Sequence, residues 1–360
     1  MDSNRSPLPV LAALILLAAA GSASADVFTV SALRASGREL EDGEVVIDLS
    51  GDVSVTDGDV LVTSDSGTVW QQSERALFVG DVRVTTDTLT ASGDLLYYDR
   101  VQGVVRLTGN AVLTDGDNVI EAREVTWFRE SGKATAEDDV VMTGSWMGMV
   151  TGQYAMYDRA RGSLFVTVDP VLRRVENGDS MTVTADRLEF FPDENRAEAQ
   201  GNAFVDVPAR EFTAESEYLR YEGDDETFEL IGSPVVRSPD GDLTGDWMEV
   251  VMRDGGLSSV RVEGGADGYF TDEGLDPPSE TWFQSQRALF TWTSGGDIES
   301  IVLDGSVSVS MKGGGEAAER AETNTVRGEH LVAEFSGGEM DRIIVTGSVR
   351  GTYSYSGAFR

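Results

Sequence analysis

Residues 184–205 read TADRLEFFPDENRAEAQGNAFV, and small or apolar side chains alternate with polar ones through most of this stretch. A period of two is typical of a strand with one buried face. Between Ala185 and Leu188 the apolar step is three, so the alternation changes face at Asp186-Arg187. One extra residue predicts a bulge or a corner, and a small neighbour such as Ala185 lets the backbone bend there.

The same pattern recurs along the whole chain. Each copy has an apolar-x-small-polar-x-apolar-x-aromatic segment, a polar turn, and a second alternating segment that ends in a Gly-polar-apolar step, as at Gly201-Asn202-Ala203. The first steps, at 51, 80, 109 and 138, are 29 residues apart (80−51, 109−80, 138−109). Stacked copies with stacked corners predict an elongated all-β body with an apolar inside and a charged outside. The steps that mark the ten copies start at Gly51, Gly80, Gly109, Asp138, Val168, Gly201, Gly232, Gly264, Gly305 and Gly347.

The overall composition excludes several classes of protein. The 360 residues carry 63 acidic and 28 basic side chains, a net charge of −35, and such a charge repels nucleic acid. The chain has no cysteine, so disulfides and thiolate metal sites are excluded. The single histidine, His330, has no second histidine to complete a metal site. We therefore expect no catalytic residues, no metal site and no cofactor.

The first 25 residues resemble a secretory signal peptide. Arg5 precedes an apolar run from Leu8 to Ala20, and Ala23-Ser24-Ala25 is a small-x-small cleavage site. The run has about 13 residues, and a membrane-spanning helix needs about 20. We therefore expect cleavage after Ala25 and export of residues 26–360.

The repeated segments resemble the OstA-like family, whose best-known members are the LptA-type periplasmic lipopolysaccharide-transport proteins. Thr184-Ala-Asp-Arg-Leu-Glu-Phe and Ala197-Glu-Ala-Gln-Gly-Asn-Ala carry the resemblance most clearly. It implies an open, elongated β-jellyroll built from about ten repeats of about 30 residues, with stacked antiparallel strands. Residues 26–360 are about twice the length of a typical member, so they form either one long jellyroll or two in tandem, at about 26–172 and 173–360.

The resemblance also implies a function. Family members hold the acyl chains of lipid A in an apolar interior and join end to end to bridge the inner and outer membranes. We therefore expect a periplasmic carrier or bridge for lipopolysaccharide or a similar amphiphile. Its expected partners are other envelope jellyroll proteins at both membranes, or further copies of this chain.

Two sets of residues are candidates for these roles. The alternating C-terminal segment is expected to form an edge strand for docking, through Tyr353, Tyr355 and Phe359. The apolar positions of the repeat are expected to line the interior and to contact lipid. They are Leu96, Tyr98, Val125, Trp127, Ala155, Tyr157, Leu188, Phe190, Leu219, Tyr221 and Leu331.

Two other readings of the repeat stay open. A structural β-solenoid, such as an envelope scaffold or adhesin, would have a dry and filled core. A carbohydrate-active β-helix enzyme would gather acidic and aromatic residues on a few rungs, whereas the aromatic residues here are spread along the copies.

Overall fold

The computed structural model describes residues 29–57, 60–87, 89–144, 147–176, 179–239, 241–253, 256–272, 277–314, 322–336 and 339–354. The expected signal peptide and two of the edge residues, Tyr355 and Phe359, lie outside these ranges and stay predictions. In the described part of the chain, no helix is long and apolar enough to span a membrane.

The described chain is almost entirely β-structure, as the alternation of the sequence predicts. It forms 26 strands, all of which pair antiparallel, and two single-turn 3₁₀ helices. The all-β fold class is confirmed. The chain divides into two compact units: unit 1 contains residues 1–174 and 186–194, and unit 2 contains residues 175–185 and 195–360. Whether the chain is one jellyroll or two in tandem stays a prediction.

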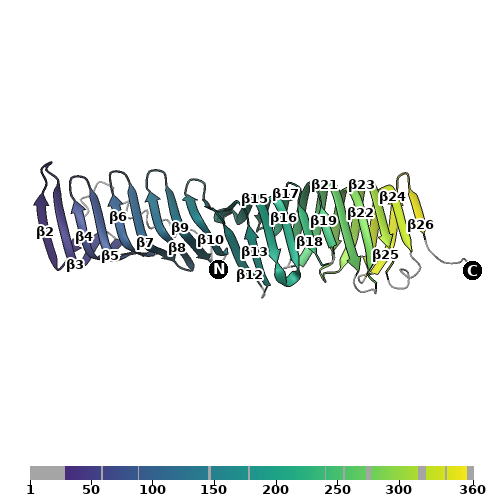
Figure 1. Cartoon of the computed structure of the whole chain (residues 1–360), viewed down its shortest axis with the longest axis horizontal. Coiled ribbons are helices and arrows are strands. Elements are labelled where there is room, and N and C mark those ends of the chain that lie inside the picture. The colour runs from purple at the N-terminus through teal and green to yellow at the C-terminus, as the bar shows by residue number, and fades with distance from the viewer. Residues whose placement is uncertain are drawn as a thin grey trace, which may run out of the picture. The chain divides into compact units, whose positions relative to one another are not determined.

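Unit 1 contains the strands drawn in purple to teal in Figure 1. They are β1 (Thr29–Ser31), β2 (Arg34–Glu39), β3 (Val45–Asp57), β4 (Val60–Trp70), β5 (Arg75–Thr85), β6 (Thr90–Asp99), β7 (Val104–Asp115), β8 (Asn118–Phe128), β9 (Lys133–Gly144), β10 (Gly148–Asp158), β11 (Ser163–Thr167), most of β12 (Val171–Glu176), β14 (Arg187–Phe191) and the 3₁₀ helix η1 (Pro192–Glu194).

Unit 2 contains β13 and everything after η1. Its elements are β13 (Asp179–Thr184), β15 (Arg196–Val207), η2 (Pro208–Arg210), β16 (Phe212–Glu222), β17 (Thr227–Ile231), β18 (Val235–Ser238), β19 (Gly241–Thr244), β20 (Trp247–Arg253), β21 (Gly256–Asp272), β22 (Ser279–Trp292), β23 (Ile298–Lys312), β24 (Thr323–Ser336), β25 (Glu339–Thr346) and β26 (Arg350–Ser354).

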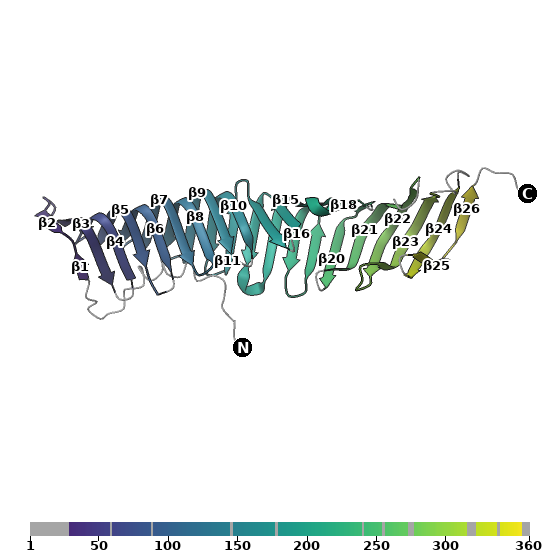
Figure 2. The same ribbon diagram turned by 90° about the horizontal axis from the view of Figure 1, so that it is seen from below.

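The long strands of each unit follow one another as hairpins. In unit 1, each strand from β4 to β9 pairs with the strand before it and the strand after it, and Figures 1 and 2 show them side by side in chain order. In unit 2, β21 to β24 pair in the same way. Sequence neighbours are therefore also neighbours in space.

The Gly-polar steps that mark the copies are corners. In β7, Gly109 and Asn110 both have positive φ, at 79° and 50°, and the pairing with β8 shifts there between Thr108 and Ala111. Glycine is needed because a Cβ at Gly109 would lie 2.2 Å from Oδ2 of Asp94. In the sequence these steps serve only as markers of the repeat, whereas in the structure they also bend the chain.

The alternate strands bend where the alternation changes face. Beside Ala185, where the sequence predicts a change of face, β13 ends at Thr184 and β14 begins at Arg187. The bend expected at Asp186-Arg187 is therefore present. In β6, the corresponding shift lies between Ser92 and Leu95, beside Gly93.

Because every hairpin bends on both of its strands, each unit has two sheet branches that meet along a line of corners. In unit 1, the part that contains β5 before Gly80 and β6 after Asp94 is called the first branch. The part on the other side of these corners is called the second branch. The core lies between the inner faces of the two branches. Leu107 and Leu113, one in each branch of β7, are both fully buried.

Candidate functional site: the apolar inner face

Two rows of side chains cross the inner face of the first branch in unit 1. Each row takes one residue from each strand, in register, so its members lie beside one another across the sheet. The deep row is next to the corners and contains Leu49, Gly67, Phe78, Leu96, Leu107, Val125, Ala136, Ala155, Val166 and Leu188. The shallow row lies two residues further from the corners and contains Ile47, Val69, Ala76, Tyr98, Val105, Trp127, Ala134, Tyr157, Leu164 and Phe190.

The register brings together all the candidate lipid-contact residues of this unit. Four of them belong to the deep row and four to the shallow row, although they are up to 94 residues apart in sequence (190−96). The repeat therefore predicted which side chains share an inner face. Lipid contact by these residues stays a prediction. The deep-row members are Leu96, Val125, Ala155 and Leu188, and the shallow-row members are Tyr98, Trp127, Tyr157 and Phe190.

The interior of unit 1 is filled by its own side chains. Both rows are mostly buried, and Trp127 is only 1% exposed. The two branches line a partly open cavity of about 20 Å³, which is enough for roughly one water molecule. Its walls come from both branches: Leu113, Ile120 and Met142 from the second, and Val125, Ala134, Thr135, Ala136, Ala155, Tyr157 and Leu164 from the first.

Two polar groups lie within this apolar interior. Burial raises the pKa of Tyr157, and the nearby negative charge of Asp193 raises it further, so the phenol stays neutral. The Nε1–H group of Trp127 is buried and has no hydrogen-bond acceptor among the described residues. Both groups are therefore uncharged near neutral pH.

Unit 2 repeats the same two rows. Two candidate residues, Leu219 and Leu331, are in its deep row, and Tyr221 is in its shallow row. The deep row contains Ala199, Leu219, Leu230, Met248, Val262, Ala288, Leu303, Leu331 and Val345. The shallow row contains Ala197, Tyr221, Phe228, Val250, Val260, Phe290, Ile301, Ala333 and Ile343.

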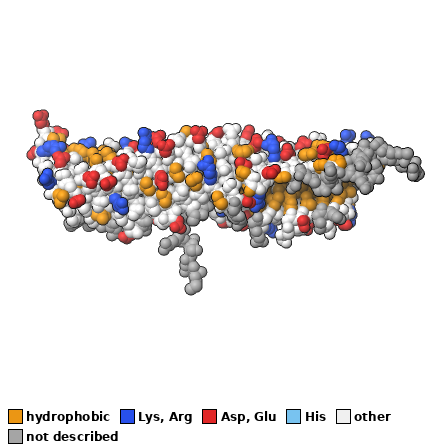
Figure 3. All heavy atoms as spheres, turned by 60° about the horizontal axis from the view of Figure 1, so that its bottom comes forward, with side chains coloured by type: hydrophobic (Ala, Val, Ile, Leu, Met, Phe, Trp, Pro, Cys, Tyr) orange, Lys and Arg blue, Asp and Glu red, His pale blue; other side chains and the backbone are white. Residues whose placement is uncertain are grey.

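The inner face of unit 2 is more open than that of unit 1. Its deep row is buried up to Leu331, but most of its shallow row is partly exposed, and Ile343 is 42% exposed. Figure 3 shows hydrophobic side chains gathered in a row on one side of unit 2, toward its C-terminal strands. The same view of unit 1 shows hydrophobic side chains scattered singly among charged ones. An apolar ligand could therefore reach the shallow row of unit 2 without unpacking the core.

Aromatic residues that the sequence analysis did not single out lie on this inner face. Phe270, Phe283, Phe290 and Trp292 form a cluster of rings with centroid distances of 5.7 to 6.3 Å. The alternation of Phe290 and Trp292 in β22 was visible in the sequence, but the unusual length of this copy hid the alignment of the four rings with the repeat. They belong to the candidate site by position.

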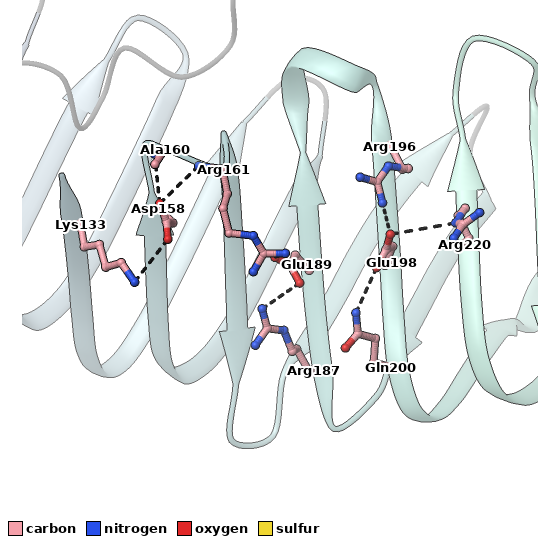
Figure 4. A network of polar contacts seen from close by, with 10 residues as sticks. All are labelled: Lys133, Asp158, Ala160, Arg161, Arg187, Glu189, Arg196, Glu198, Gln200 and Arg220. Carbon is pink, nitrogen blue, oxygen red and sulfur yellow. Dashed lines mark hydrogen bonds and ion pairs between the residues drawn. The ribbon is translucent and has the colours of Figure 1, made fainter. Parts of the chain in front are cut away.

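The outer faces carry charge networks. In unit 1, Glu189 is almost fully buried and lies between Arg187, at 2.7 Å, and Arg161, at 3.6 Å (Figure 4). Burial alone would raise the pKa of Asp158, but hydrogen bonds from Lys133 and from backbone N–H groups hold this pKa below its usual value. These contacts compensate buried charges of the strands and leave the inner face apolar.

A second network lies within unit 2. Glu198 accepts a hydrogen bond from Gln200 Nε2 at 3.0 Å and pairs with Arg196, and Arg220 Nε lies 4.0 Å away (Figure 4). A carboxylate shared by several donors needs no ligand cation to neutralise it. This network is structural.

The remaining candidate residues are on the outside or at an edge. His330 Nδ1 lies 3.6 Å from Asp304 Oδ1, and both side chains are about two-fifths exposed. In the described ranges, no group of three or more His, Cys, Asp or Glu residues could hold a metal ion. Tyr353 is in β26, is 56% exposed, and pairs through its strand with β24. Edge docking at Tyr353 stays a prediction.

Residues 32–133, which include β2 to β8 of unit 1, match the family model described as LptA/(LptD N-terminal domain) LPS transport protein. The resemblance to the LptA-type family is confirmed. A comparison with curated proteins finds no match.

The solved structures that are similar to this chain include an LptA-type protein. It is LptH, the LptA homologous periplasmic component of the conserved lipopolysaccharide transport device from Pseudomonas aeruginosa. The identity is 16% and the TM-score is 0.21, over 40% of this chain and 82% of LptH.

Proposed function

We propose that this protein is a carrier or bridge that binds the acyl chains of a lipopolysaccharide-like amphiphile on the inner face of unit 2. The observation that carries the proposal is the partly exposed shallow row of that unit. Its apolar side chains lie in register on successive strands, from Tyr221 on β16 to Ile343 on β25. Lipid sites are lined mainly by apolar and aromatic side chains, as this row is.

The energetics fit such a role. Burying one methylene group is worth about 0.8 kcal/mol, so an acyl chain of about twelve carbons needs on the order of 10 kcal/mol of apolar contact to leave a membrane. Equivalent rows on neighbouring strands offer similar contacts at each position. A chain can then move along the row without crossing a large energy barrier.

We place this activity in the periplasm, between the inner and outer membranes. The resemblance to an LptA-type family and the expected signal peptide support this location. Partners would be other envelope jellyroll proteins, or further copies of this chain, paired with the edge strands of the described chain. The expected docking strand is β26, which contains Tyr353.

Site-specific photo-crosslinking in cells tests the proposal. A photo-reactive phenylalanine analogue replaces Phe228 on the inner face of β17, and in a matched variant it replaces Glu229, the next residue, on the outer face. We expect an adduct with lipopolysaccharide from position 228 and none from position 229. No adduct from position 228, nor from Val250 or Ile301 in the same row, would contradict the carrier function.

A second candidate function applies to unit 1. Its interior favours a structural role as a β-solenoid scaffold, because its inner rows are mostly buried and the cavity beside Val125 and Tyr157 holds only about one water molecule. The same cross-linker at Trp127 separates the two roles. An adduct there would mean that unit 1 opens to admit lipid, and no adduct would favour the scaffold.

A further inference from the structure

The ring cluster of unit 2 has members on both sides of the core. Phe270 and Phe283 stack with centroids 5.8 Å apart, and Phe290 meets them edge-on at 5.7 Å and tilted at 5.8 Å. Trp292 extends the cluster from Phe290, at 6.3 Å. All four rings come from the neighbouring strands β21 and β22.

These contacts join the two branches of the unit. The corner of β21 is at Gly264-Gly265, where the pairing with β22 shifts between Glu263 and Ala266. In unit 2 the first branch is the part that contains the deep and shallow rows, and the second branch lies on the other side of the corners. Phe270 and Phe283 lie beyond the corner, in the second branch. Phe290 lies in the first branch, where it pairs with Val260. The contact between Phe270 and Phe290 therefore closes the space between the two inner faces at this rung.

The local sequence leaves room around these rings. A Cβ at Gly268 would lie 2.0 Å from Cε1 of Phe283, so only glycine accommodates that ring. The two pairing partners of Phe270 are Gly241, which has no side chain, and Thr281, which has a short one. Phe270 is partly exposed, whereas Phe290 is 2% exposed. Phe270 is therefore the ring that can swing aside.

The shallow row continues on both sides of this rung. Val250 precedes it and Ile301 follows it, and both are partly exposed. A chain lying along the row meets the Phe270–Phe290 contact between these positions. Rings at 5.7 Å leave no space for a methylene chain between them.

We propose that Phe270 and Phe290 form a constriction that determines how many acyl chains can lie abreast in unit 2. This inference rests on the proposed lipid-binding function. One chain passes along Trp292, the partly exposed ring at the end of the cluster. A second chain at the same rung needs Phe270 to leave Phe290. The pair thus discriminates between single-chain and multi-chain amphiphiles.

Binding measurements with the full chain test this role. Because the protein has no cysteine, an Ile301→Cys variant takes up an environment-sensitive fluorophore at one defined place. Two probes are titrated: lipid A, which carries several acyl chains, and a single-chain lysophospholipid. In this background, Phe270→Ala is expected to tighten lipid A binding by about three- to tenfold and to leave lysophospholipid binding unchanged. Phe270→Leu, which keeps the bulk, is expected to behave like the parent.

Phe228→Ala is the matched control. Phe228 is a partly exposed ring of the same row, and its partner Tyr221, at 4.7 Å, is in the same branch. This variant should not favour lipid A over the lysophospholipid.

If Phe270→Ala and Phe228→Ala change both affinities alike, the constriction is refuted while lipid binding stands. If the parent binds neither probe, the proposed function itself is refuted. If Phe270→Ala does not fold, Phe270→Val is used, with the same expected preference.

Discussion

At the residue scale, the interior of this protein depends on where side chains are missing. Gly67, Gly93 and Gly268 all lie in strands, and at each of them a Cβ would come within 3.0 Å of an inner-face side chain of the next strand. In an ordinary strand glycine lowers stability, so its presence here marks a close approach. The small positions of the repeat thus decide which large side chains fit.

Gly268 offers the clearest test of this packing. Gly268→Ala should place a methyl group against the ring of Phe283 and lower the free energy of unfolding by about 1–3 kcal/mol, as overpacking does. Urea unfolding followed by fluorescence measures the change. Gly295→Ala is the control, because the nearest atom to its Cβ is Oγ1 of Thr293 at 3.6 Å. Equal stability of the two variants would contradict the packing argument.

Asp115 is a buried carboxylate at the turn between β7 and β8, and its Oδ2 has no hydrogen-bond partner in the described chain. Burial raises its pKa. A raised pKa means that the folded protein holds this proton more tightly than the unfolded chain. The contribution of Asp115 to the stability of the fold is therefore greatest below the pKa that this carboxyl has in the unfolded chain. It falls as the pH rises from there through the pKa of the folded protein.

We expect Asp115→Asn to stabilise the protein at pH 7 by roughly 1 kcal/mol, because a neutral amide replaces a poorly solvated charge. The gain should shrink as the pH is lowered toward 4, where the carboxyl of the parent takes up its proton. Urea unfolding at several pH values measures this. Asp117→Asn, an exposed change in the same turn, should have little effect at any pH. A gain that persists unchanged at low pH would exclude this explanation.

At the element scale, the corners of each hairpin are the feature that turns a ribbon into two branches. Most copies place glycine first in the corner, but the corner between β11 and β12 has Val168-Asp169, with φ of 62° and 56°. Positive φ is strained for a β-branched residue. This corner stores strain that the glycine corners do not.

Val168→Gly should therefore stabilise the protein by about 1 kcal/mol, the usual gain from removing a left-handed non-glycine residue. Val175→Gly is the matched control, since Val175 is also exposed but lies within strand β12. Its loss of strand propensity should destabilise the protein by about 0.5–1 kcal/mol. Thermal unfolding compares the two. If the melting temperature changed in the same direction in both variants, the proposed strain at Val168 would be contradicted.

The sequence predicted the elements and the inner rows well. A period of two with one change of face was enough to place Leu96, Val125 and Leu188 in one row, because register follows from alternation and turn length. The sequence did not reveal that the Gly-polar steps are corners, because the positive φ of both residues in each step is seen only in the structure. Nor could it separate the filled unit 1 from the more open unit 2, because both units use the same repeat with similar residues. How far apart two inner faces lie depends on packing across the core, and no local pattern records that distance.

At the scale of the whole molecule, the net charge of −35 opposes compaction. The ion pairs of the outer faces, such as Lys312 with Glu280 at 3.0 Å, offset only part of this repulsion. Added salt screens the remainder, since the Debye length falls from about 30 Å at 0.01 M to about 8 Å at 0.15 M.

Stability should therefore increase with ionic strength. Between 0.01 M and 0.15 M sodium chloride we expect the melting temperature to rise by about 2–4 °C, the shift that follows each kcal/mol gained in a domain of 150–250 residues. Differential scanning calorimetry measures it, with an uncharged solute at equal osmolarity as the control. A melting temperature that stays constant or falls would mean that the outer-face ion pairs outweigh the repulsion.

Pairing between consecutive hairpins has an evolutionary consequence. A hairpin in the middle of β4 to β9 meets only its predecessor and its successor, and it offers each of them the same pattern of donors, acceptors and apolar groups. Duplicating or deleting one such hairpin would leave every other contact intact. The gene can therefore lengthen or shorten its product by whole hairpins without the invention of a new fold.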